Sequence, residues 1–77
     1  MNDIPWNKII LNDFISMACL SDDETAILKD WAAGKSVVST AMSRNISTRQ
    51  VDNYRNQIRK KYDAVQIYSP LLPKRTK

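Results

Sequence analysis

The chain has 77 residues, of which 43% are hydrophobic and 26% charged, with one glycine, one cysteine and no histidine. This length fits one small domain, and the apolar content is too high for an intrinsically disordered chain. The single cysteine excludes an intramolecular disulfide, and the lack of histidine excludes a Cys/His zinc site, Ser-His-Asp catalysis and Cys-His catalysis. Because a glycine-rich phosphate loop and a convincing carboxylate pair are also lacking, we expect neither an enzyme nor a metal or cofactor.

Charge is distributed unevenly along the chain. Residues 1–31 carry two basic and six acidic side chains, a net charge of −4, whereas residues 32–77 carry ten basic and two acidic side chains, a net charge of +8. This asymmetry within one small domain is typical of a protein that binds a polyanion such as nucleic acid. The alternative is a solvated basic helix followed by a basic tail.

The first expected element is a helix over residues 5–18, with Pro5 at its first position. Its apolar residues spread over roughly 240° of the helix surface. A helix that packs on a small domain needs an apolar stripe of only ~100° or a little more. Such a helix is either nearly engulfed by its own domain or packs one face on a second copy of the chain. We expect the second arrangement, because engulfment is hard to achieve in so small a chain. Trp6, Phe14 and Trp31 are expected in the core, because large aromatic side chains dominate burial in small domains.

A second helix begins after Ser21, which forms a capping box with Glu24, and Gly34 provides its left-handed stop. A short third helix then runs to about Arg44, and Asn45 can adopt the left-handed conformation that ends it. We expect its apolar set to comprise Val37, Val38, Ala41 and Met42.

A second capping box, Ser47 with Gln50, starts a fourth helix that is expected to reach about Tyr62. The apolar Ala64, Val65 and Ile67 are compatible with a longer helix, but Ser69-Pro70 ends it by residue 69. The expected fold is thus all-α: one helical domain over residues 1–69, with a helix-turn-helix at about 36–62, and an extended basic tail over 70–77.

The chain shows no secretory signal and no apolar run of the ~20 residues needed to cross a bilayer, so no membrane association is expected. Its single unpaired cysteine fits a reducing compartment, and we expect a cytoplasmic protein.

In a helix-turn-helix, the second helix enters the major groove of DNA and reads base edges from its N-terminal turns. Here the exposed positions of residues 48–62 are rich in Asn, Gln and Arg rather than in the Glu–Lys pairs of a merely solvated helix. Asn and Gln pair with adenine, Arg and Lys with guanine, and Asp accepts from cytosine. The candidate DNA-binding residues are Thr48, Arg49, Gln50, Asp52, Asn53, Arg55, Asn56, Arg59 and Lys60.

From Leu20 to Tyr62 the chain resembles the LuxR/GerE-type helix-turn-helix, a DNA-binding domain found at the end of many bacterial regulators. Region 4 of sigma factors is built similarly and is a close second resemblance. The matching residues follow one another in order without a gap: Leu20, Glu24, Leu28, Ala32, Gly34, Ser36, Ala41, Ile46, Ser47, Val51, Asn53, Arg55, Ile58 and Lys61.

The resemblance implies a four-helix domain in which the third helix supports and the fourth recognises DNA. It implies base-reading roles for Asp52, Asn53 and Asn56, and phosphate or base contacts for Arg49, Arg55, Arg59 and Lys60. Arg55 has a structural alternative, a pairing with Glu24, and Arg59 has another, a solvated side chain.

Three residues depart from the family pattern. Asp52 stands where the family usually has lysine, and Thr40 and Arg44 stand where it places apolar core residues. The sequence also lacks the receiver or ligand-binding domain that usually precedes this module, as expected of a free-standing regulator from a mobile element or phage.

Two functions from different classes are compatible with these patterns. The first is a sequence-specific regulator of transcription that binds double-stranded DNA through residues 48–62. The second is a small helical protein-interaction module, an adaptor or a sigma-like or anti-sigma-like partner, without DNA specificity of its own. Expected partners are double-stranded DNA, a second copy bound through helix 5–18, and RNA polymerase as a further candidate.

Overall fold

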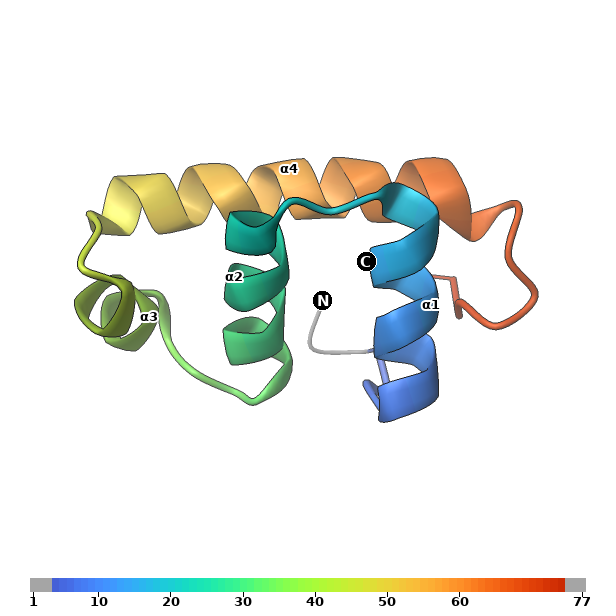
Figure 1. The fold of residues 1–77 in the computed structure, drawn as a ribbon, viewed down its shortest axis with the longest axis horizontal. Helices are drawn as coiled ribbons and strands as arrows, with labels where there is room; N and C mark the ends of the chain where they lie inside the picture. Colours follow the sequence, from blue (N-terminus) through green and yellow to red (C-terminus); the bar gives the residue numbers. More distant parts are fainter. Residues whose placement is uncertain (1–3, 75–77) are drawn as a thin grey trace.

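The computed structural model describes residues 4–74, which form four α-helices and no strand. The helices are α1 (Lys8–Ala18), α2 (Asp22–Ala32), α3 (Val37–Arg44) and α4 (Thr48–Gln66). The three shorter helices lie along one side of the long α4, which packs against each of them (Figure 1). The expected small all-α domain with four helices is confirmed. No helix in residues 4–74 has the length and apolarity to span a membrane.

The helix ends predicted from a capping box or from a left-handed Gly or Asn are confirmed. Ser21 Oγ accepts a hydrogen bond from the Glu24 amide, and the Glu24 carboxylate accepts one from the Ser21 amide. Ser47 and Gln50 form the same reciprocal pair at the start of α4. Gly34 has a φ of 86° just after α2, the left-handed conformation that glycine adopts without steric cost.

One helix start differs from the prediction, and the end of one helix takes the longer of the two lengths that the sequence allows. Helix α1 begins at Lys8 rather than at Pro5, because the side chain of Asn7 accepts the hydrogen bond of the Ile10 amide at 2.9 Å and so caps the helix. Helix α4 continues four residues beyond Tyr62 to Gln66, and the half-buried Val65 packs against the core there. This burial extends the helix up to the turn that precedes Pro70.

An aromatic cluster joins α1 to α4. The Phe14 and Tyr62 ring centroids lie 5.1 Å apart with the rings nearly perpendicular, and Trp6 lies about 6 Å from both. Phe14 and Trp31 are buried as expected, whereas Trp6 is half-buried at the edge of the core.

Helix α3 turns only part of its predicted apolar set toward the core. Val38 and Met42 are 58% and 78% exposed, whereas Thr40 and Ala41 are buried. The face toward the core runs through Val37, Thr40 and Ala41, which are spaced three and four residues apart as one helical face requires. The prediction is confirmed for Val37 and Ala41 and wrong for Val38 and Met42, which lie beside this row, while the polar Thr40 takes a core position.

The segment after α4 returns to the core. Leu72 is buried, the Tyr62 hydroxyl donates to the Pro73 carbonyl, and the Gln66 amide donates to the Leu72 carbonyl at 3.2 Å. The Ser69 hydroxyl donates to the Asp13 carboxylate of α1 at 2.6 Å. Residues 70–73 thus pack on the helices instead of forming the start of an extended tail. Of the expected basic tail, Lys74 is exposed and residues 75–77 lie outside the described residues.

Candidate nucleic-acid interface

Helices α3 and α4 form a helix-turn-helix with a three-residue connection, residues 45–47. Asn45 takes the left-handed conformation with a φ of 57°, as predicted. The Ile46 amide donates to the Ala41 carbonyl at 3.0 Å, and the Ile46 side chain packs against the core. The turn is therefore held at both its backbone and its side chain, which fixes the direction in which α4 leaves α3.

Helix α4 has two opposite faces. Val51, Ile58 and Tyr62 are fully buried against the other helices. On the opposite side lies an exposed stripe whose members are spaced four, three and four residues apart, a spacing that places them along one line of the helix. The stripe consists of Arg49, Asn53, Asn56 and Lys60.

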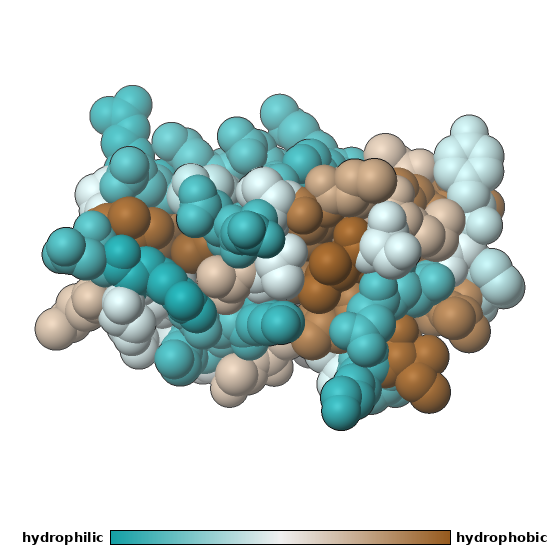
Figure 2. All heavy atoms as spheres, in the orientation of Figure 1, coloured by the Kyte–Doolittle hydropathy of each residue, from teal (hydrophilic) through white to brown (hydrophobic). Residues whose placement is uncertain are grey.

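Five of the nine predicted site residues therefore share one accessible side of the molecule, the stripe together with the exposed Asp52 beside it. Figure 2 shows hydrophilic side chains projecting along the edge where α4 lies. Hydrophobic side chains gather in the half of the molecule that contains α1. The stripe thus presents amide and cationic groups to solvent without an apolar surface between them.

Two other predicted residues in the first turn of α4, Thr48 and Gln50, lie outside the stripe. Thr48 is exposed in the first turn. The Gln50 side-chain oxygen accepts the hydrogen bond of the Ser47 amide at 3.0 Å, so this side chain caps the helix. Only the amide nitrogen of Gln50 is left for a contact outside the protein.

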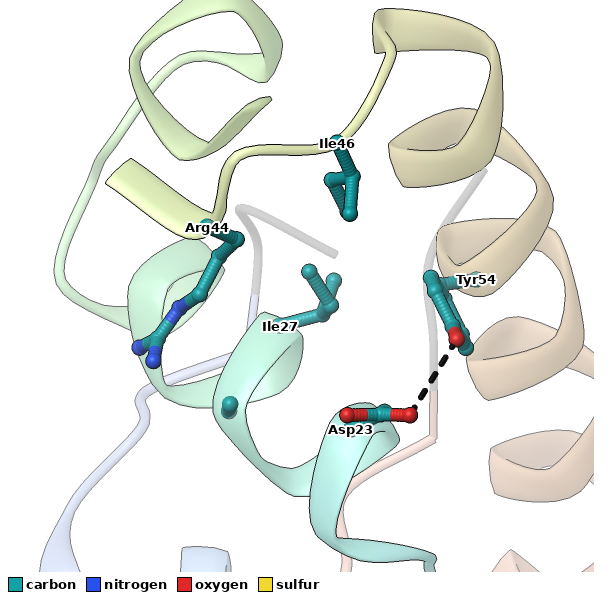
Figure 3. A pocket seen from close by; sticks show the side chains of 6 residues that line it. Asp23, Ile27, Arg44, Ile46 and Tyr54 are labelled. Carbon is teal, nitrogen blue, oxygen red and sulfur yellow. Dashed lines mark hydrogen bonds between the residues drawn. The ribbon is translucent and has the colours of Figure 1, made fainter. Parts of the chain in front are cut away.

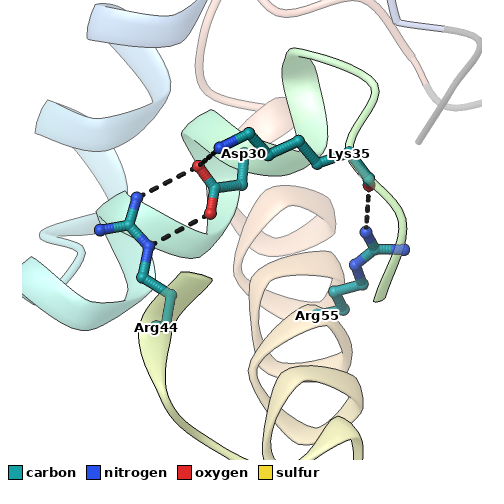
Figure 4. A network of polar contacts seen from close by, with 4 residues as sticks. All are labelled: Asp30, Lys35, Arg44 and Arg55. Atoms are coloured by element: carbon teal, nitrogen blue, oxygen red, sulfur yellow. Dashed lines mark hydrogen bonds and ion pairs between the residues drawn. The ribbon is translucent and has the colours of Figure 1, made fainter. Parts of the chain in front are cut away.

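Arg55 is a structural residue in this fold. Its guanidinium lies 4.5 Å from the centroid of the Trp31 ring, and its Nη2 donates to the Lys35 carbonyl at 3.0 Å (Figure 4). Burial lowers the pKa of Arg55, and the nearby charge of Arg59 lowers it further, while Asp52 opposes the shift. Arg55 thus fastens α4 to the connection between α2 and α3.

The alternative pairing of Arg55 with Glu24 is wrong, because Lys61 occupies that position. Lys61 Nζ lies 2.7 Å from Glu24 Oε1. Burial raises the pKa of Glu24, but the bonds from Lys61 and Ser21 outweigh it and hold this pKa below its ordinary value. The pair fixes the start of α2 against the middle of α4.

Arg59 is not simply solvated either. It is half-buried, with its guanidinium 5.0 Å from the centroid of the Trp31 ring. Its Nη1 donates to Asn56 Oδ1 at 2.9 Å. Arg59 therefore connects a core residue of α2 to the exposed stripe.

Sequence analysis did not identify the polar network around Asp30 (Figure 4). Arg44 forms two hydrogen bonds of 3.1 Å with the Asp30 carboxylate, and Lys35 Nζ lies 3.6 Å from it. The bonds from Arg44 lower the pKa of Asp30 against the effect of burial, with a further contribution from Lys35. One signal was present in the sequence, since Arg44 stands where the family usually has an apolar residue.

A hollow of about 160 Å³ lies on one flank of the helix-turn-helix (Figure 3). The Tyr54 hydroxyl donates to the Asp23 carboxylate at 3.4 Å across one side of it. Residues 4–74 contain no group of three or more His, Cys, Asp or Glu side chains placed to hold a metal ion. The hollow is lined by Asp23, Ala26, Ile27, Arg44, Ile46 and Tyr54, none of which belongs to the exposed stripe.

The family model for bacterial regulatory proteins of the luxR family, also called GerE, matches residues 18–67. The match covers α2, α3 and α4 and 50 of the 77 residues. The chain belongs to the luxR family. The comparisons with curated proteins and with solved structures give no match. As a member of this family, the chain is a DNA-binding regulator with a helix-turn-helix.

Proposed function

We propose that this luxR-family chain binds specific sequences of double-stranded DNA and regulates transcription, with α4 in the major groove. The observation that carries the proposal is the exposed stripe on α4, in which two asparagines lie between Arg49 and Lys60. The major groove admits an α-helix, and side chains on one line of that helix can reach successive base pairs.

The chemistry of the stripe matches what each part of a DNA site offers. Asparagine amides form paired hydrogen bonds with adenine, and Asp52 can accept from the amino group of cytosine. Arg49 and Lys60 lie at the two ends of the stripe, where a helix in the groove comes close to the phosphates on either side. The asparagines would then supply sequence preference, and the two cations register and affinity.

The charge distribution also favours an orientation in which the stripe of α4 faces the DNA. Two of the six acidic residues of the N-terminal half, Glu24 and Asp30, are buried and paired with basic side chains, so their charges do not face a ligand. Arg49 and Lys60 are exposed and have no ion pair with a described residue. The stripe therefore presents positive charge on the side that would meet DNA.

Measurement of duplex binding at several salt concentrations tests this function. Anisotropy of a labelled duplex should show affinity that falls steeply with salt, with a log–log slope of about −0.9 for each phosphate neutralised. For two to four contacts the slope would be about −2 to −4. A folded chain that binds no duplex at low salt would contradict the proposal and leave the protein-interaction module as the function.

Replacement of Asn53 by alanine tests base reading. We expect affinity for the preferred sequence to fall by about 1–3 kcal/mol, while affinity for random duplex is retained, because only a base contact is lost. Asn12 is exposed on α1, away from the stripe, so Asn12→Ala serves as the matched control. Equal weakening on all sequences would make Asn53 a phosphate contact instead.

The expected homodimer also remains a proposal. Ile10, Leu11 and Ile15 of α1 are half-buried against the core, which leaves Ile9 and Met17 as the exposed large apolar side chains of this helix. Ile67, Tyr68 and Leu71 are exposed next to the end of α4. Association through these side chains should give a dimer in sedimentation at ~100 µM, since a moderate interface has a dissociation constant of ~1 µM. A monomer at that concentration would contradict it.

RNA polymerase as a partner and the cytoplasm as the location complete the proposal. Both follow from regulation of bacterial transcription, the role of the family. Copurification of the polymerase with the chain on a promoter duplex tests the first, and cell fractionation tests the second.

A further inference from the structure

A chain of contacts leads from the core to one of the two asparagines of the stripe. Trp31 of α2 is only 7% exposed, and the Arg59 guanidinium lies 5.0 Å from its ring centroid. Arg59 Nη1 then donates to Asn56 Oδ1 at 2.9 Å. Asn53, three residues earlier on the same stripe, forms no side-chain hydrogen bond with another residue of the described chain. The side-chain amide of Asn56 is therefore held by a hydrogen bond within the protein, whereas that of Asn53 is not.

The bond from Arg59 decides which way the Asn56 amide faces. A guanidinium carries only donors, so the amide atom that meets it must be the oxygen. The amide nitrogen consequently points away from Arg59, and a flip would bring two donor groups together. Asn53 has no such constraint and can turn either end of its amide toward a base.

Arg59 can impose this orientation because it is itself held in place. The indole ring below it belongs to the core, and planar guanidinium groups stack well on aromatic faces. Arg55 occupies the same ring at 4.5 Å and is bonded to the Lys35 carbonyl. Because the two like charges repel each other, Arg55 limits how far Arg59 can move toward it over the ring.

We propose that Arg59, supported by Trp31, is a positioning residue that fixes the Asn56 amide with its NH₂ group toward the major groove. The base that Asn56 contacts is then one with an acceptor on its major-groove edge, a purine or thymine, whereas cytosine offers only a donor there. Loss of Arg59 removes this preference at one base pair and leaves the base pair contacted by Asn53 unchanged. This inference rests on the proposed function, because it assigns a role within the same interface.

Selection of bound sequences from a random duplex pool tests the inference. Asn56→Ala identifies the base pair that Asn56 contacts. Arg59→Gln should weaken the preference at that base pair about fivefold or more, because glutamine can present either a donor or an acceptor to Asn56. Arg49→Gln is the matched control: it removes one charge from the same helix, and it should weaken binding to all sequences alike. Arg59→Lys should restore affinity for random duplex but only part of the preference.

Two results would overturn the inference. One is an unchanged preference at the Asn56 base pair in Arg59→Gln. The other is uniform weakening by Arg59→Gln, as with Arg49→Gln, which would make Arg59 a phosphate contact. Failure of the proposed function gives a different result: the folded wild-type chain would then bind duplex without any base preference. That result is seen in the wild type alone, whereas the two results above compare a variant with the wild type.

A measurement without DNA tests the same contact. In the free protein, ¹⁵N relaxation should show an ordered Asn56 side-chain amide and a more mobile Asn53 amide. Arg59→Gln should make the Asn56 amide as mobile as that of Asn53, with the backbone unchanged. If Asn56 is already as mobile as Asn53 in the wild type, Arg59 does not position it.

Discussion

At the residue scale, the Thr40 side chain is the clearest unsatisfied group in the core. It is fully buried in α3, and its hydroxyl has no hydrogen-bond partner among residues 4–74. Burial of an unpaired hydroxyl costs free energy, while a methyl group of the same shape does not. We expect Thr40→Val to raise the free energy of unfolding by about 1 kcal/mol, measured by urea denaturation.

Thr40→Ser is the matched variant. It keeps the unpaired hydroxyl and removes a buried methyl group, so we expect it to lower the free energy of unfolding by about 1 kcal/mol. If valine and serine both destabilise, the hydroxyl has a partner, such as a buried water, that the protein needs.

At the element scale, the pair of Asp30 and Arg44 joins α2 to α3, and its two members differ in burial. The Asp30 side chain is 7% exposed and that of Arg44 is 42% exposed. Arg44→Leu therefore leaves a buried carboxylate with only Lys35 near it, and we expect it to lower the free energy of unfolding. Asp30→Leu leaves a cation that can turn to solvent and should cost less.

The double variant Asp30→Leu with Arg44→Leu isolates the interaction between the two side chains. It replaces the ion pair with apolar contact, which is often neutral or stabilising, so we expect stability equal to or above that of the wild type. A urea-denaturation cycle over the four proteins measures the coupling. Additive losses in the double variant would show that the two residues act independently.

The two buried carboxylates of α2, Asp30 and Glu24, predict how stability depends on pH. The pKa values of Asp30 and Glu24 are lower in the folded chain than in the unfolded one, so their contribution is complete above the unfolded pKa of about 4. It is lost as the pH falls through the folded values. The melting temperature should thus fall progressively as the pH drops below about 4. Arg44→Leu should show a smaller loss, because the pKa of Asp30 is then no longer held down.

The sequence predicts some of these elements well for a physical reason. A capping box or a left-handed Asn or Gly involves residues within a few positions of each other, so the ends of α2 and α3 and the start of α4 could be found locally. The buried polar Thr40 of α3 could not be predicted from residue type, and the pairing of Arg44 could not be predicted either, because its partner Asp30 belongs to another helix. The polar partner of Arg44 lies fourteen positions away.

The exposed stripe on α4 was predictable in the same local way, since helical spacing alone separates it from the buried face. The roles of Arg55 and Arg59 were not, because both depend on the ring of Trp31, which belongs to another helix. Charge and residue type cannot distinguish an arginine that meets DNA from one that stacks on an indole. Only the packing of α2 against α4 does so.

At the scale of the whole molecule, the segment after α4 packs on the part of the core that α1 and the end of α4 form. Leu72 is 3% exposed, whereas its neighbour Leu71 is 50% exposed. The cluster that Leu72 joins contains Ile4 and Phe14 from the other end of the chain. The two ends of the chain therefore stabilise one another through this core.

This arrangement gives a matched pair of variants. We expect Leu72→Ala to lower the free energy of unfolding by about 2–3 kcal/mol, because it opens a cavity in a core whose total stability is on the order of 5 kcal/mol. The melting temperature should fall by about 10 °C or more. Leu71→Ala removes the same atoms from an exposed side chain and should change stability by less than about 0.5 kcal/mol. Equal effects of the two variants would mean that residues 70–73 do not pack on the core, as in the extended tail that the sequence suggests.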